Sequence, residues 1–424
     1  MKALLFERNL PRFAASRLLS TIGSGRGAAV GPLRLTDVDT PIPPDLDWHV
    51  LRPTLSGICG SDLATIDGRT SRYFEDIVSF PFVPGHEVVG VLDGGGEDHA
   101  GTPLPPGSRA VVEPVLGCRP RSIVPECPDC AAGDHGLCGN TAFGTLPPGL
   151  QTGFCQGTGG GWSTAGLVAH RSQIHAVPPG MTDEAAVMIE PTACAVHAVL
   201  SAPIQAGDTV AVIGAGTLGL AAVAALHHLV APETPCTLLV GARYDHQRRL
   251  AGDLGADVVV PADHLARAVR RHTGSLSLGG RLTGGADVVF DCVGSAASLD
   301  QSLSMVRPRG TVVLMGMPGR LKVDLAVLWH REIRLVGAYA YGHEPAGSPP
   351  EQGGPRARRP EGTTHGIRTF DLAIDLVERA DLGRLVSAAY PLDRFEEALA
   401  HAGAAGRRGA VKVTFDLRSR KGQP

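Results

Sequence analysis

Two short motifs and one later carboxylate supply the side chains that catalytic zinc binds. Cys59 is followed by Gly60-Ser61-Asp62, and His86 and Glu87 are adjacent in a second motif. Glu190 adds another carboxylate further along the chain. Catalytic zinc takes three ligands from cysteine, histidine and carboxylate side chains and leaves a fourth position open. A single cysteine or histidine more often belongs to a core, so the prediction of a catalytic zinc site rests on the combination.

Four further cysteines form a cluster of the kind that binds structural zinc. They are Cys118, Cys127, Cys130 and Cys138. Four thiolates are enough to close a tetrahedral zinc site. The eight residues 119–126 separate the first two cysteines, so this loop has to bulge outward if all four sulfur atoms are to reach one ion. The alternative is a remnant lobe that binds no metal.

A glycine-rich turn predicts a dinucleotide site. It follows the apolar run 209–213, precedes helical spacing over 218–229, and consists of Gly214, Ala215, Gly216, Thr217, Leu218 and Gly219. The first glycine permits a tight turn, the second lets the backbone approach a pyrophosphate, and the third lets the helix pack on the strand. In a chain with 55 glycines such a match can be incidental, but the strand, turn and helix context favours nucleotide binding.

The residues after the next predicted strand indicate which dinucleotide binds. Sites that prefer NAD have a carboxylate at the end of the second strand, where it accepts a hydrogen bond from a ribose hydroxyl. Here the strand 237–240 is followed by Gly241-Ala242-Arg243. A guanidinium at this place can bind a 2′-phosphate, so the sequence favours NADP over NAD. The alternative is that Arg243 is a solvated residue and that nearby Asp245 serves NAD.

Two kinds of element have to position these residues. Short segments interrupted by glycine and proline, with apolar alternation over 82–92, 108–115 and 165–177, predict an antiparallel barrel or sandwich early in the chain. From about Gly207 onward, strands of buried type alternate with helices, which predicts a doubly wound parallel sheet. The expected strands there are 209–213, 237–240, 257–260, 286–292 and 311–315, and the expected helices are 218–229, 247–254, 264–271 and 297–306.

The last part of the chain begins with a segment poor in apolar residues. Residues 342–366 are rich in proline, glycine and arginine, which predicts a long surface loop. Helices are expected over 370–386 and 395–402, followed by a closing strand over 410–415.

Composition excludes several classes of protein. With 43% hydrophobic and 19% charged residues, the chain of 424 residues is globular and long enough for two domains. Its net charge of −3 provides no basic field for nucleic acid. It has no apolar run long enough to span a membrane and no signal-peptide cleavage pattern at its start, so we expect a cytoplasmic protein with reduced cysteines and no membrane partner.

The motifs resemble those of the zinc-dependent alcohol and polyol dehydrogenases of the medium-chain dehydrogenase/reductase superfamily. The likeness covers nearly the whole chain and includes two later segments, 291–294 and 307–310. It implies a Rossmann sheet over 204–340 and a mostly antiparallel, GroES-like catalytic domain. That domain would be formed by 1–203, with a zinc lobe at 113–140, and by the returning segment 341–424. The Glu190-Pro191 pair looks most like sorbitol and threonine dehydrogenases.

The resemblance also implies roles for individual residues. Cys59, His86 and either Glu87 or Glu190 would hold the catalytic zinc, and the cysteine cluster would hold a structural one. Ser61 would take the proton of the alcohol, and Asp62 would orient His86; an ordinary turn-capping role is the alternative for Asp62. The histidine that carries the proton outward in many relatives is replaced by Ala64. Eight residues separate Cys118 from Cys127 where the family usually has two.

The expected function follows from these assignments. We expect a zinc-dependent enzyme that transfers a hydride between NADP and a secondary alcohol or its ketone, resembling a polyol, sugar or amino alcohol. The alternatives are an NAD-linked enzyme of the same type, a zinc-free reductase on the same fold, and a non-catalytic nucleotide or zinc sensor. Relatives assemble through edge strands, so a homodimer or homotetramer is expected, with 312–315 and 333–336 as the candidate strands.

Overall fold

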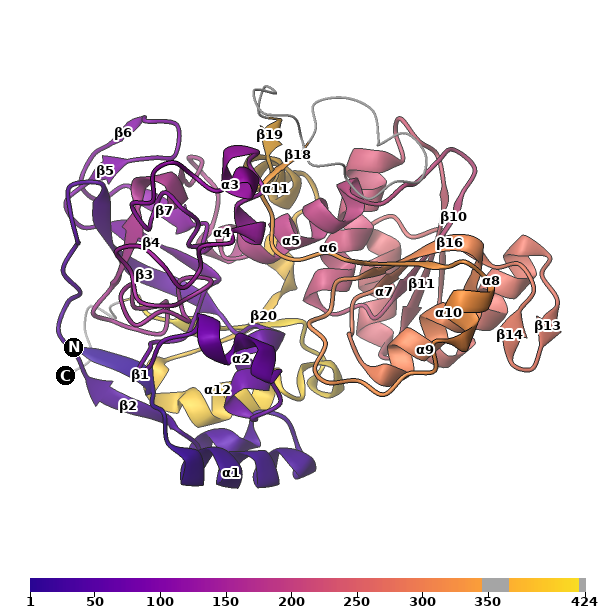
Figure 1. The fold of residues 1–424 in the computed structure, drawn as a ribbon, viewed down its shortest axis with the longest axis horizontal. Helices are drawn as coiled ribbons and strands as arrows, with labels where there is room; N and C mark the ends of the chain where they lie inside the picture. Colours follow the sequence, from indigo (N-terminus) through magenta and orange to yellow (C-terminus); the bar gives the residue numbers. More distant parts are fainter. Residues whose placement is uncertain (345–365, 419–424) are drawn as a thin grey trace. The chain divides into compact units, whose positions relative to one another are not determined.

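The computed structural model describes residues 1–344 and 366–418, which divide into two compact units (Figure 1). The first unit comprises Met1–Glu190 and Asp381–Pro424, and the second comprises Pro191–Ala380. Most of the predicted loop at 342–366 lies outside the described residues. The described ends of that segment pair as two short strands, β18 (His343–Glu344) and β19 (Ile367–Arg368). The predicted domain ranges, 1–203, 204–340 and 341–424, stay a prediction.

The second unit is built on a six-stranded parallel sheet, which confirms the predicted doubly wound class. Every residue of its central strand β10 is buried, as expected for a strand covered on both faces. The strands in spatial order are β12 (Val258–Pro261), β11 (Thr237–Ala242), β10 (Thr209–Ile213), β15 (Ala286–Asp291), β16 (Val306–Leu314) and β17 (Arg334–Gly337).

The helices of this unit follow the expected alternation. One core cluster joins the sheet to α8, α9 and α10, whereas α6 and α7 pack against the sheet outside that cluster. Strand β16 pairs with strands on both sides, so the expectation that 312–315 is an edge was wrong; of the two candidate strands, β17 is the one at an edge. The helices that alternate with these strands are α6 (Thr217–Ala225), α7 (Asp245–Asp253), α8 (Leu265–Thr273), α9 (Ala296–Met305) and α10 (Ala326–His330).

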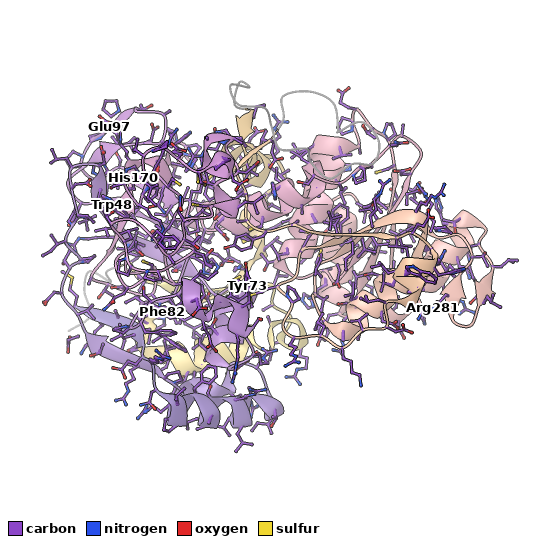
Figure 2. The ribbon with its side chains drawn as sticks, viewed as in Figure 1. Trp48, Tyr73, Phe82, Glu97, His170 and Arg281 are labelled. Carbon is purple, nitrogen blue, oxygen red and sulfur yellow. The ribbon has the colours of Figure 1, made fainter. Side chains whose placement is uncertain are left out.

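The first unit contains a seven-stranded, mostly antiparallel sheet, as the sequence predicts. Its centre is β3 (Trp48–Gly57), which pairs with β4, β8 and β21. Trp48 on β3 meets His170 on β8 edge to face, with ring centroids 5.6 Å apart (Figure 2). The other strands are β4 (Val88–Leu92), β7 (Arg109–Val112), β8 (Leu167–His170), β9 (Ile174–Ala176), β20 (Val386–Tyr390) and β21 (Lys412–Asp416).

Two elements differ from the sequence prediction. Helix α1 (Leu10–Leu19) follows the first strand, β1 (Lys2–Phe6), where no helix was expected. Its start is capped because the Asn9 side chain accepts a hydrogen bond from the backbone amide of Arg12 at 3.1 Å. The helix predicted over 370–386 ends early: α11 covers Thr369–Arg379 and β20 follows. Asp381, with φ of 50°, turns the chain between them.

No helix in 1–344 or 366–418 is both long and apolar enough to cross a membrane.

Candidate metal and nucleotide sites

The first candidate site lies where β3 ends and β4 begins. Cys59 caps the start of helix α2 (Gly60–Ile66), directly after β3, and His86 and Glu87 directly precede β4. These two strands pair antiparallel, so the end of one meets the start of the other. The ligand atoms of Cys59, His86 and Glu87 lie within 4.8 Å of one another. The fold therefore brings together three side chains that zinc accepts.

Glu87 is held by a lysine that the sequence analysis missed. Both carboxylate oxygens of Glu87 accept hydrogen bonds from Lys412 Nζ at 2.6 Å, and both side chains are buried. Gly57 leaves room for this carboxylate, since a Cβ there would overlap it. Burial lowers the pKa of Lys412, but Glu87, with help from Cys59 and Glu190, more than offsets this, and the net pKa lies above its ordinary value. The carboxylate of Glu87 is thus paired with a buried cation, Lys412, without a metal.

Asp62 connects the two halves of this site. Its Oδ2 accepts a hydrogen bond from the backbone amide of Cys59 at 2.9 Å, so the turn-capping alternative holds for one oxygen. Its Oδ1 lies 3.5 Å from His86 Nδ1, and both side chains are buried. Burial lowers the pKa of His86, but Asp62 raises it, and the net pKa lies well above the ordinary value. This placement suits a carboxylate that orients a ligand histidine.

The remaining predicted residues of this site lie close by. Ser61 is half-buried in the first turn of α2, two residues after Cys59. Glu190 is buried in the first turn of α5 (Ile189–Leu200). It is not one of the three residues whose ligand atoms cluster, but its charge helps to raise the pKa of Lys412. The structure therefore groups Glu87 with Cys59 and His86, and brings Glu190 within electrostatic reach of Lys412.

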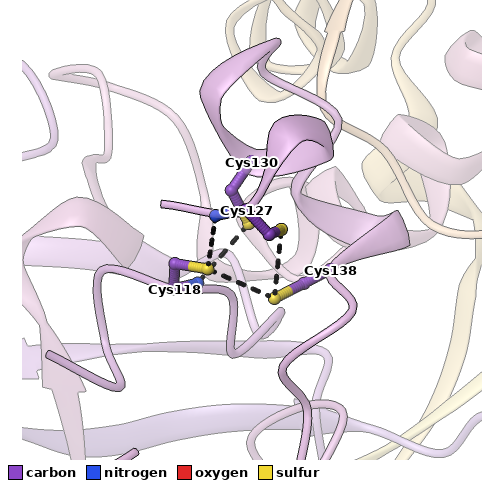
Figure 3. A group of neighbouring side chains, drawn as sticks. All are labelled: Cys118, Cys127, Cys130 and Cys138. Carbon is purple, nitrogen blue, oxygen red and sulfur yellow. Dashed lines mark hydrogen bonds between the residues drawn. The ribbon is translucent and has the colours of Figure 1, made fainter. Parts of the chain in front are cut away.

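The four cysteines of the second cluster converge (Figure 3). Their ligand atoms lie within 4.8 Å of one another, and the sulfur atoms of Cys118 and Cys138 are 3.7 Å apart. Backbone amides are directed at the sulfurs: Cys127 donates to Cys118 at 3.3 Å, and Asn140 donates to Cys138 at 3.3 Å. Amides that donate to sulfur stabilise thiolates, so the donor set and its surroundings fit zinc.

The inserted loop 119–126 only partly bulges outward, contrary to expectation. Val124 is 91% exposed, but Arg121 is fully buried. The loop turns tightly because the amides of Arg121 and Ile123 both donate to the carbonyl of Cys118, at 3.1 and 3.0 Å. Its closure places Cys127 beside Cys118 despite the long spacing.

The predicted nucleotide motif forms the turn between β10 and α6, and its three glycines play three different parts. Gly214 has φ of 88°, which favours glycine. A Cβ on Gly219 would overlap the carbonyl oxygen of Gly214, so this position lets the helix approach the strand. A Cβ on Gly216 would meet no atom of the described residues within 4 Å. That open space, at the amino end of a nine-residue helix, fits a pyrophosphate.

Gly219 and Gly216 give a matched test of the nucleotide site. Gly219→Ala is expected to destabilise the protein by about 1–3 kcal/mol, because the added methyl group overlaps backbone. Gly216→Ala is expected to unfold as the wild type does but to bind the dinucleotide about tenfold more weakly or worse. Thermal unfolding and titration calorimetry separate the two effects. Unchanged cofactor affinity of Gly216→Ala would contradict the assignment.

Arg243 lies directly after β11 and is exposed, as a residue that meets a ligand from solvent has to be. A second cation that the sequence analysis missed lies nearby. Arg248, on α7, donates to the carbonyls of Ala242 and Arg243 at 3.2 Å each and pairs with Asp245. Asp245, the carboxylate considered for NAD, is therefore engaged by an arginine.

Comparison with known proteins agrees with this geometry. A family model described as alcohol dehydrogenase GroES-like domain matches residues 46–179, and one described as zinc-binding dehydrogenase matches residues 217–348. L-Idonate 5-dehydrogenase of Vitis vinifera is 30% identical over 288 residues, which cover 67% of this chain and 71% of that protein. The chain belongs to the zinc-dependent alcohol dehydrogenases of the medium-chain dehydrogenase/reductase superfamily.

Other proteins similar to this dehydrogenase are named for sugars or polyols. D-Xylulose reductase A of Aspergillus oryzae is 28% identical over 310 residues, covering 72% of this chain and 78% of that protein. The fold matches that of galactitol-1-phosphate dehydrogenase of Escherichia coli, with a TM-score of 0.66 at 19% identity, over 98% of this chain and all of that one. The predicted family and enzyme class are thus confirmed: the dehydrogenase is a zinc-dependent oxidoreductase that uses a nicotinamide cofactor.

Proposed function

We propose that the enzyme transfers a hydride between NADP and a secondary alcohol group of a polyol, sugar or amino alcohol. The cluster of Cys59, His86 and Glu87 carries this proposal, because it offers zinc three ligands from two adjacent turns. The charged side chains of Glu87, Glu190 and Lys412 support a polar substrate, and the sugar and polyol dehydrogenases among the relatives agree with it.

We assign the catalytic zinc to Cys59, His86 and Glu87, with Glu190 as the alternative carboxylate. The clustering of the first three supports this assignment, although Lys412 competes for Glu87. When bound, zinc supplies a Lewis acid that polarises the substrate oxygen. The four-cysteine cluster would hold a second, structural zinc.

The protein's own groups have separate tasks in this proposal. Ser61, two residues after Cys59, would accept the proton of the substrate alcohol through its hydroxyl. Asp62 holds the Cys59 backbone and faces His86, so it fixes the orientation of two ligands. Ala64 offers no group to carry the proton onward, so water has to take it to solvent.

A substrate panel tests the proposed activity. Formation of NADPH is expected with polyols, sugars or amino alcohols and to be weak with simple apolar alcohols. Turnover confined to simple apolar alcohols would overturn the substrate class, and higher catalytic efficiency with NAD would favour the NAD-linked alternative.

Arg243 is expected to determine the cofactor preference. Arg243→Ala should lower kcat/KM for NADP by about 10–100-fold, because a guanidinium bound to the 2′-phosphate contributes roughly 1.5–3 kcal/mol. The value for NAD should stay near that of the wild type, since NAD has no such phosphate. Arg271→Ala, which removes an exposed arginine from α8, serves as the control. Equal losses with both cofactors would contradict this role.

The expected homodimer or homotetramer remains part of this proposal. Strand β17 supports it, because it is an edge of the parallel sheet and all four of its residues are exposed.

A further inference from the structure

A buried arginine lies beside the four-cysteine cluster. Arg121 belongs to the inserted loop 119–126 and has no exposed surface. Its guanidinium donates hydrogen bonds to five backbone carbonyls, and each of its three nitrogens takes part. These carbonyls belong to Leu116 at 3.0 Å, Phe143 at 3.0 Å, Leu146 at 3.2 Å, Pro147 at 3.3 Å, and Gly149.

These contacts join the two chain segments that flank the cluster. Leu116 lies just before Cys118, whereas 143–149 follows Cys138. The backbone of the same loop contacts the later segment as well, because the amide of Thr145 donates to the Arg121 carbonyl at 3.1 Å. Arg121 thus links the segment before Cys118 to the segment after Cys138.

The charge of Arg121 needs a counter-charge. A buried guanidinium is costly unless an anion compensates it, and no carboxylate within 1–344 or 366–418 forms an ion pair with Arg121. The groups whose negative charge would attract the guanidinium are the thiolate forms of Cys155, which has the largest effect, and of Cys138 and Cys118. Two of these belong to the cluster. Four thiolates around one Zn²⁺ carry a formal charge of about −2, so the cluster with its metal provides an anion that can compensate Arg121.

We propose that Arg121 is the internal counter-charge and positioning residue of the four-cysteine zinc site. The insertion between Cys118 and Cys127 supplies the cation that stabilises the zinc tetrathiolate. The same side chain holds the two flanking segments together through its hydrogen bonds. The inference rests on the proposed function in one respect, namely that this cluster binds zinc.

Zinc release from purified enzyme tests this role. Arg121→Met removes the charge and the donors, and Arg121→Lys keeps the charge with fewer donors. Arg119→Met is the matched control, because it removes a more exposed arginine from the same loop. The readouts are zinc content, the rate of zinc transfer to a colorimetric chelator, and the thiolate-to-cobalt absorption after exchange with Co²⁺.

Arg121→Met is expected to lose the lobe zinc about 10–100-fold faster than the wild type, as is typical when a group that supports metal ligands is removed. Arg121→Lys should fall between Arg121→Met and the wild type, and Arg119→Met should match the wild type. The zinc that depends on Cys59 should stay in all three. If Arg121→Met does not fold, Arg121→Gln, which also removes the charge, is measured in its place.

Two results would overturn it. One is release at the wild-type rate from Arg121→Met, or from Arg121→Gln where Arg121→Met does not fold. The other is equal release from Arg121→Met and Arg121→Lys, which would leave no part for the charge. A different failure is recognisable without any Arg121 variant. If Cys130→Ser contains as much zinc as the wild type, the cluster holds no zinc, and the premise fails rather than the role of Arg121.

Discussion

Cys59→Ala is expected to lower kcat/KM by about three orders of magnitude or more while dinucleotide binding persists. The variant removes one of three clustered ligands, and the Lewis acid of the reaction contributes several kcal/mol to transition-state stabilisation. The dinucleotide motif lies in the other compact unit, so its affinity for the cofactor should not depend on this thiol. Initial rates with the best alcohol of the panel and calorimetric titration with NADP measure the two properties.

Cys236→Ala is the control for this experiment. Cys236 directly precedes β11 in the second unit. It belongs neither to the four-cysteine cluster nor to the cluster of Cys59, His86 and Glu87. Wild-type rates are expected for it. Retention of most activity by Cys59→Ala would show that this thiol holds no catalytic metal, whereas loss of cofactor binding would indicate misfolding and would require the same comparison with Cys59→Ser.

Lys412→Met is expected to lower the free energy of unfolding of the first unit by about 3–5 kcal/mol. In chelator-treated protein, where no zinc can take the place of Lys412, the substitution leaves the carboxylate of Glu87 buried without the cation that both of its oxygens bind at 2.6 Å. Adding Glu87→Gln should recover part of the loss, because the double variant buries no unpaired charge. Urea denaturation followed by tryptophan fluorescence suits this unit, since Trp48 and Trp162 are both buried in it.

Lys2→Met provides the comparison for Lys412→Met. Lys2 also forms an ion pair, with Asp37 at 2.6 Å, but both side chains are largely exposed. Exposed pairs contribute little to stability, so this variant should unfold almost as the wild type does. If the two lysine variants unfold alike, or if Glu87→Gln deepens the loss, the buried pair is not what stabilises this unit.

The parts of the site that depend on local sequence could be predicted. Cys59, His86 and Glu87 lie at the ends of two strands, and the glycine motif has to follow its strand directly, so short motifs report them. The parallel sheet was predictable for the same reason, because each buried strand is a continuous apolar run such as 209–213.

The parts that depend on distant contacts could not. Lys412 is separated from Glu87 by more than three hundred residues, and only the pairing of β21 with β3 brings them together. Lysine is scarce, with Lys412 one of four in the chain, but this scarcity does not indicate which residue Lys412 contacts. Arg121 looks like any loop arginine, since its burial depends on how 143–149 folds over it. The contact of Arg248 with the end of β11 likewise could not be predicted, because it depends on how α7 packs beside that strand.

Elemental analysis of zinc in protein purified without added metal is the most direct test of the central claim, that this chain is a zinc enzyme with a catalytic and a four-cysteine site. About two zinc ions per chain are expected in the wild type, about one in Cys59→Ala and about one in Cys130→Ser. Folded protein that contains no zinc and takes none up would contradict the account.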